Sequence, residues 1–127
     1  MPVLGIGTDI LVTSRILAII SRSPERFDRF ARKILHPSEH SRLSSDPKDA
    51  CRLLASTWAA KEALYKSLED EDQKIFQFKH WYRTVKDGKR VLKNDNYVKD
   101  DQFFVSVSHD GDYTSAFVVR TGKSRDN

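Results

Sequence analysis

The chain has 127 residues, of which 39% are hydrophobic and 31% charged, so its size and composition predict one globular domain spanning residues 1–127. No apolar run approaches the roughly 20 residues of a membrane helix, so we expect a soluble protein with no membrane partner. The single cysteine excludes an internal disulfide, so we expect an intracellular location. The net charge of +4 favours an anionic partner, which could be a nucleic acid, an acidic protein or a phosphate-rich small molecule.

The first ten residues alternate in the manner of a β-strand. One face carries apolar side chains and the other carries two glycines and a carboxylate: Leu4, Ile6 and Ile10 against Gly5, Gly7 and Asp9. A strand face with two glycines predicts close approach by another backbone or by a ligand. Asp9 itself fits two roles, a metal-binding carboxylate or the N-cap of the helix that follows.

Three helical segments are expected next, at Ser14–Ser21, Pro24–Leu35 and Lys48–Leu68. The last is the strongest, because its apolar residues recur at 3.6-residue spacing. Lys61 falls inside this apolar stripe. It could pack its stem on the neighbouring leucines while its ammonium reaches water, or it could have a functional role.

Glu62 and Lys66 are four residues apart on the same expected helix, so they share a face. They could form an ordinary surface ion pair or part of a carboxylate–lysine site. Small residues flank this face, namely Ala55, Ala59 and Ala63. They predict room for a bulky ligand beside the helix.

Two hairpins are expected after the helices. Phe78–Lys93 contains Asp87-Gly88, a favourable two-residue hairpin turn. Gln102–Arg120 contains His109 at the end of its first strand, as a structural histidine or as a phosphate ligand. One early strand, a helical half and four later strands predict an α+β fold, with one long and several shorter helices packed on a mainly antiparallel sheet.

Four segments in chain order resemble the holo-acyl-carrier-protein synthases, the small type of the 4′-phosphopantetheinyl transferase superfamily. They are "GIGTDI" at Gly5–Ile10, "RFARKILHPSE" at Arg29–Glu39, "WAAKEALYKSL" at Trp58–Leu68 and "VSVSHDGDYTSAFVV" at Val105–Val119. The resemblance implies the 4′-phosphopantetheinyl-transferase-like fold. It also implies Mg²⁺-dependent transfer of 4′-phosphopantetheine from coenzyme A to a serine of an acidic apo acyl carrier protein, with release of adenosine 3′,5′-bisphosphate. A homotrimer whose subunits share the site is implied as well.

The same resemblance implies roles for individual residues. Asp9 and Glu62 match the magnesium carboxylates, and Lys66 matches a lysine beside the pyrophosphate; these three are the expected catalytic residues. The positions matching coenzyme A contacts are Lys61, Lys66, Gly88, Lys89, Ser108 and His109, with His109 near the 3′-phosphate. Arg15 and Arg22 are seven residues apart, so they share a helix face if the first helical segment persists through both. They match positions that present positive charge to the carrier.

Three departures from the family pattern concern the nucleotide. Thr57 stands where many members have an arginine, and Arg90 replaces a proline of the G-K-P turn. After Leu68, the acidic segment "EDEDQKIFQF" replaces a Gly-rich loop, and its charge is wrong for wrapping a phosphate. These departures predict that the contacts between the protein and the nucleotide differ from those of the family. They also favour a eukaryotic, mitochondrial member over a bacterial, cytoplasmic one.

Two other functions stay open at the level of residues. A small basic nucleic-acid-binding domain could use the aromatics of "FKHWYR" as a stacking platform. A catalytically inactive relative of the transferases could bind coenzyme A or a carrier protein without transferring phosphopantetheine. The four collinear matches favour the transferase, with no nucleic-acid partner.

Overall fold

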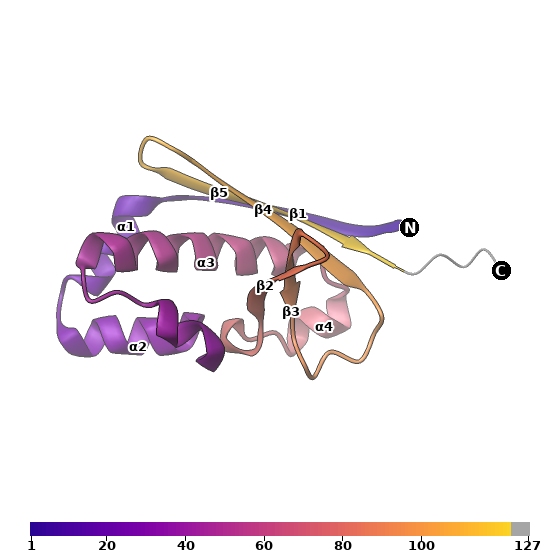
Figure 1. The fold of residues 1–127 in the computed structure, drawn as a ribbon, viewed down its shortest axis with the longest axis horizontal. Helices are drawn as coiled ribbons and strands as arrows, with labels where there is room; N and C mark the ends of the chain where they lie inside the picture. Colours follow the sequence, from indigo (N-terminus) through magenta and orange to yellow (C-terminus); the bar gives the residue numbers. More distant parts are fainter. Residues whose placement is uncertain (123–127) are drawn as a thin grey trace.

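Strand β1 (Val3–Val12) forms one edge of a five-stranded antiparallel sheet in the computed structural model, which describes residues 1–122. The other strands are β2 (Tyr82–Lys86), β3 (Lys89–Lys93), β4 (Gln102–Asp110) and β5 (Tyr113–Thr121). Their order is β1-β5-β4-β3-β2, so β1 pairs with β5, the last strand of the chain (Figure 1). The predicted α+β class is confirmed. The last residues of the predicted domain, 123–127, lie outside the described part.

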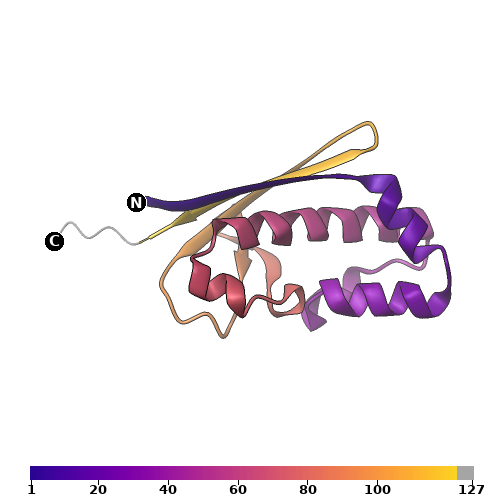
Figure 2. The same cartoon turned by 180° about the vertical axis from the view of Figure 1, so that it is seen from behind.

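The helices lie on one face of the sheet, which we call the inner face (Figures 1 and 2). They are α1 (Thr13–Ile20), α2 (Pro24–Ile34), α3 (Pro47–Ser67) and α4 (Asp70–Lys74), with 3-10 turns η1 (Pro37–Arg42) and η2 (Phe78–His80). The three long helices begin and end within one residue of their predicted bounds. The sequence patterns did not predict α4, η1 or η2.

Local caps explain where the helices begin. Ser23 and Asp46 precede α2 and α3, and each side chain accepts a hydrogen bond from the backbone N–H three residues on. Helix α1 has no cap of its own. Instead Asp112, in the β4–β5 turn, accepts from the N–H of Ser14 at 3.0 Å and from its hydroxyl at 2.6 Å. The tip of this hairpin is thereby fixed to the start of α1.

The glycine face of β1 packs directly on the backbone of α3. A Cβ added to Gly7 would lie 1.8 Å from the carbonyl oxygen of Ala63, and one added to Gly5 would lie 2.2 Å from that of Ser67. The predicted close approach is therefore confirmed, and the approaching group is a backbone. The expectation that alanines leave room for a ligand is wrong, because Ala55, Ala59 and Ala63 are fully buried in the core.

The opposite face of the sheet, which we call the outer face, is exposed and apolar around β1 and β5. Its large side chains Ile6, Ile10, Tyr113 and Phe117 are 59%, 66%, 55% and 45% exposed. The register places Thr8 beside Phe117 and Ile6 beside Val119, so these side chains form one surface. No helix among residues 1–122 covers it (Figures 1 and 2).

Candidate active site

The three predicted catalytic residues meet where α3 passes the edge strand β1. Asp9 extends from β1, and Glu62 and Lys66 extend from α3. The Lys66 Nζ lies 3.3 Å from Asp9 Oδ1 and donates to the carbonyl oxygen of Thr8 at 2.9 Å. Asp9 lies inside the strand and Val12 occupies the N-cap position of α1, so the capping interpretation of Asp9 is wrong.

The two carboxylates repel each other. Burial raises the pKa of Glu62, the negative charge of Asp9 raises it further, and Lys66 acts in the opposite direction. The side chain of Asp9 is therefore within electrostatic reach of Glu62. Among residues 1–122, no group of three or more His, Cys, Asp or Glu side chains is arranged so that it could hold a metal ion. Two carboxylates nevertheless suit Mg²⁺, which commonly takes one or two of them and completes its shell with phosphate oxygens and water.

Lys61, a predicted coenzyme A contact, is fully buried in the core. Its Nζ donates to the carbonyl oxygen of Ile34 at 2.7 Å and to Glu39 Oε1 at 2.8 Å. Lys61 therefore has no exposed surface with which to bind a phosphate, and its ammonium does not reach water. The structure places it in a buried ion pair beneath α3.

The predicted nucleotide residues Ser108 and His109 point to opposite sides of β4. His109 belongs to the inner face, where its Nδ1 lies 3.2 Å from the hydroxyl of Thr114. Ser108 is exposed on the outer face, in the register row that contains Ser115 and Ile10. Their side chains point to opposite faces of the sheet within one chain, because neighbouring strand residues alternate.

Gly88 and Lys89 lie at the β2–β3 turn, on the opposite edge of the sheet from Asp9. Asp87 and Gly88 have φ of 52° and 75°, the left-handed values that a two-residue hairpin turn requires, so the predicted turn is confirmed. Lys89 begins β3, which lies three strands away from the strand of Asp9, roughly 14 Å at the usual strand spacing. The structure does not bring these residues to Asp9 within one chain.

Arg15 and Arg22 are both exposed. Arg15 lies in α1, but α1 ends at Ile20, so Arg22 belongs to the turn before α2. The expectation that the two arginines share a helix face is therefore wrong. Both still lie on the α1 side of the molecule.

The acidic segment after Leu68 folds as α4 and is held by ion pairs. Lys99 lies 2.8 Å from Glu71 and 2.7 Å from Asp72, and Arg120 lies 2.8 Å from Glu69. These carboxylates are neutralised by cations of the chain itself. The segment is therefore a short helix tied to Lys99 and Arg120, and its weaker binding of phosphate stays a prediction.

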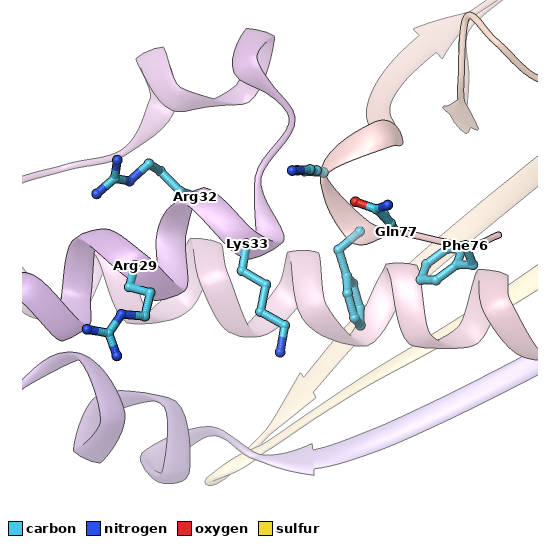
Figure 3. Close-up of a pocket in the computed structure, with 7 residues that line it drawn as sticks. Arg29, Arg32, Lys33, Phe76 and Gln77 are labelled. Carbon is cyan, nitrogen blue, oxygen red and sulfur yellow. The ribbon is translucent and has the colours of Figure 1, made fainter. Parts of the chain in front are cut away.

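Two basic cavities were not predicted. One, of about 480 Å³, lies between α2 and η2, and Arg29, Lys33 and Phe76 are among the residues that line it (Figure 3). The other, of about 440 Å³, contains Arg83 of β2. The excess of Lys and Arg was the one sequence feature that pointed to basic cavities. Their positions left no local pattern, because the lining residues come from segments that are distant in sequence.

Comparison with known proteins identifies the family of the chain. Residues 5–118 match the 4′-phosphopantetheinyl transferase superfamily. A holo-[acyl-carrier-protein] synthase of Mycoplasma mobile is 34% identical over 85% of this chain and 87% of its own length. A mitochondrial holo-[acyl-carrier-protein] synthase of Eremothecium gossypii is 33% identical over 93% of this chain and 79% of its own length. The crystal structure of a synthase from Bacillus anthracis in complex with CoA (3′,5′-ADP) superposes with a TM-score of 0.69, at 24% identity over 95% of this chain and 98% of that one.

The chain belongs to the 4′-phosphopantetheinyl transferase superfamily. Within it, the relatives assign the chain to the holo-acyl-carrier-protein synthases, so it is a transferase. Among residues 1–122, none of the helices has the length and apolar character needed to cross a membrane.

Proposed function

We propose that this synthase transfers 4′-phosphopantetheine from coenzyme A to a serine of an acidic apo acyl carrier protein, in an Mg²⁺-dependent reaction that releases adenosine 3′,5′-bisphosphate. The observation that carries the proposal is the convergence of Asp9, Glu62 and Lys66 at one point of the surface. The Bacillus anthracis structure, described with bound CoA (3′,5′-ADP), supports the choice of substrate.

Asp9 and Glu62 would hold the metal ion, which when bound would neutralise phosphate charge and make the phosphorus more electrophilic. Lys66 is 49% exposed, so its ammonium can leave Asp9 to contact the pyrophosphate of a bound substrate. There it would stabilise the negative charge that develops on the departing bisphosphate. The carrier serine is the nucleophile, and the bond that breaks joins the pantetheine phosphate to the nucleotide.

The proposal includes a homotrimer that shares the site between subunits. The residues expected at the nucleotide, Gly88, Lys89 and His109, lie on β3, β4 or their turns, whereas Asp9 lies on the far edge strand. Ser108 lies on the exposed apolar outer face. Association of copies through the outer face would bury that surface and join the two halves of the site.

Two further features belong to the proposal. Arg15 and Arg22 are exposed cations without an ion pair among residues 1–122, as a docking surface for an acidic carrier requires. A mitochondrial location is proposed for a eukaryotic source, and the Eremothecium relative supports it through its name.

Mass spectrometry of a purified apo carrier protein, incubated with the chain, coenzyme A and Mg²⁺, tests the proposal. We expect the carrier to gain one phosphopantetheine group, and chromatography to detect an equal amount of adenosine 3′,5′-bisphosphate. Chelation of the metal should abolish both products. Unmodified carrier under saturating conditions would show that the proposed reaction is wrong.

A further inference from the structure

Three arginines from three different elements line one cavity of about 440 Å³: Arg42 at the end of η1, Arg83 in β2 and Arg90 in β3. The other lining residues are neutral, namely Thr84, Val85, Val105 and Val107. Within residues 1–122, no carboxylate forms an ion pair with any of the three guanidinium groups. A cavity with three unpaired cations and apolar walls has the composition of an anion-binding site.

Arg83 is held in place by the long helix. Its Nη2 donates to Thr57 Oγ1 at 3.0 Å and to Ser56 Oγ at 3.2 Å. Its Nε is buried and has no hydrogen-bond partner in residues 1–122. A buried donor without an acceptor costs roughly 1–3 kcal/mol. An anion in the adjoining cavity is the kind of group that supplies the missing acceptor.

The charges in the cavity are not balanced by the protein. Burial lowers the pKa of Arg83, and the positive charges of Arg42 and Arg90 lower it further, while Glu39 acts in the opposite direction. Glu39 is itself neutralised, because its Oε1 lies 2.8 Å from the Nζ of Lys61. A bound anion would relieve the repulsion among the three guanidiniums, each of which can bind two oxygens of a phosphate.

The cavity also lies among the residues expected at the nucleotide. Val107, one of its walls, comes two residues before His109 and shares the inner face of β4 with it. Arg90 follows the Gly88-Lys89 turn directly. The pyrophosphate of coenzyme A is already assigned to Lys66 in the proposed function, on which this inference rests. The phosphate that remains is the 3′-phosphate.

We propose that Arg42, Arg83 and Arg90 bind the 3′-phosphate of the coenzyme A nucleotide, beside His109. Arg83 Nη2 donates to the hydroxyl of Thr57, so its guanidinium lies beside the middle of α3. The cations that grip the nucleotide in this chain therefore come from η1, β2 and β3. The carboxylates of Glu69, Glu71 and Asp72, at and before the start of α4, pair instead with Lys99 and Arg120.

Isothermal titration calorimetry with adenosine 3′,5′-bisphosphate and adenosine 5′-monophosphate tests this inference, because the two nucleotides differ by the 3′-phosphate alone. The key variant is Arg42→Gln combined with Arg90→Gln, since both side chains are exposed and the fold should not depend on them. Arg83→Gln is the second variant. Arg26→Gln, an exposed arginine at the start of α2, is the matched control.

We expect the double variant and Arg83→Gln each to bind the bisphosphate more weakly by a factor of about ten or more. A loss of this size is expected when a hydrogen bond between charged groups is removed. Their affinity for the monophosphate, and both affinities of the control, should stay at wild-type values. Equal loss for the two nucleotides, or no loss for either, overturns the inference. If the wild type still modifies a carrier in that case, the proposed function stands; a wild type that neither binds the bisphosphate nor modifies a carrier overturns both.

Discussion

At the scale of single residues, the pair of Lys61 and Glu39 explains why a charged residue lies in the apolar stripe of α3. Burial lowers the pKa of Lys61 to about 8, yet two hydrogen bonds keep its ammonium form dominant at neutral pH. Burial alone would raise the pKa of Glu39, but Lys61 and the backbone N–H groups of Arg83 and His36 lower it below its ordinary 4.5. The pair fixes η1 and β2 against α3.

Replacing Glu39 with glutamine should destabilise the protein by about 3 kcal/mol or more, because it leaves a buried ammonium without its counter-charge. Urea denaturation at neutral pH measures the free energy of unfolding. The matched control is Glu25→Gln, an exposed glutamate of α2, which should change it little. Equal stability of the two variants would contradict a structural role for the pair.

The same pair predicts a dependence on acidic pH. The folded-state pKa of Glu39 is lowered, so its stabilisation is present above the unfolded value near 4.5 and is lost as pH falls through the folded pKa. The wild type should therefore lose stability between neutral and acidic pH more steeply than Glu39→Gln. Urea midpoints measured over this range check the slope, and parallel curves for the two proteins would be the contrary result.

At the scale of elements, the contact between β1 and α3 positions Asp9 beside Glu62. Two glycines make this contact possible, since Gly5 and Gly7 face backbone carbonyls of the helix. At these two positions the strand therefore lies closer to the helix than residues with a Cβ could. This explains why a carboxylate of β1 meets two side chains of α3.

Gly7→Ala should lower the free energy of unfolding by about 3 kcal/mol or more. The new Cβ would clash with the backbone of Ala63, and neither β1 nor α3 can move independently to relieve the clash. Gly111→Ala is the control: its Cβ would meet nothing within 4 Å, and only the φ of 57° opposes it, at about 1–2 kcal/mol. Urea denaturation compares the two. A smaller loss for Gly7→Ala than for Gly111→Ala would show that the contact is not tight.

Helix α1 and the turn after it should carry the carrier-docking charge. Arg15→Glu combined with Arg22→Glu should raise KM for the carrier and flatten its dependence on salt, with KM for coenzyme A nearly unchanged, because exposed interface charges mainly set association. Steady-state kinetics at several salt concentrations measures this effect. Lys93→Glu, at the far end of β3, is the control. Unaltered carrier kinetics at low salt would contradict the proposal that Arg15 and Arg22 bind the carrier.

Most elements could be predicted from local patterns, because the period of the α3 stripe, the Asp87-Gly88 turn and the alternation of β4 depend on neighbouring residues. The positions of single side chains could not. Lys61 was ambiguous, since its partner Glu39 lies 22 residues away in a 3-10 turn that has no sequence period. The same holds for Arg83, whose contact with Thr57 joins β2 to the middle of α3. Long-range pairing of this kind leaves no local signal.

At the scale of the whole molecule, one face of the sheet is covered by helices and the other is exposed and apolar. The alternation of β1 correctly separated Ile6 and Ile10 from the glycines. It could not show that the apolar side chains face outward, because burial depends on which face the helix covers. Self-association is the expected use of the outer face.

Phe117→Glu should break this association, because it places a charge in the centre of the apolar surface. Sedimentation velocity should find a trimer for the wild type and a monomer for the variant. Val98→Glu, at a side chain that is 93% exposed and lies outside β1 and β5, should leave the trimer intact. A monomeric wild type, or a trimeric Phe117→Glu, would contradict the shared site.

The central claim is that Asp9, Glu62 and Lys66 together carry out Mg²⁺-dependent phosphopantetheine transfer. The most direct test is the single-turnover rate of carrier modification, followed by mass spectrometry as Mg²⁺ is titrated. We predict that Asp9→Asn and Glu62→Gln lower this rate by orders of magnitude, whereas Lys66→Ala lowers kcat more than it raises KM for coenzyme A, because leaving-group charge develops in the transition state. The exposed control Glu25→Gln should behave like the wild type. Near-normal transfer by Glu62→Gln at low Mg²⁺ would contradict the claim.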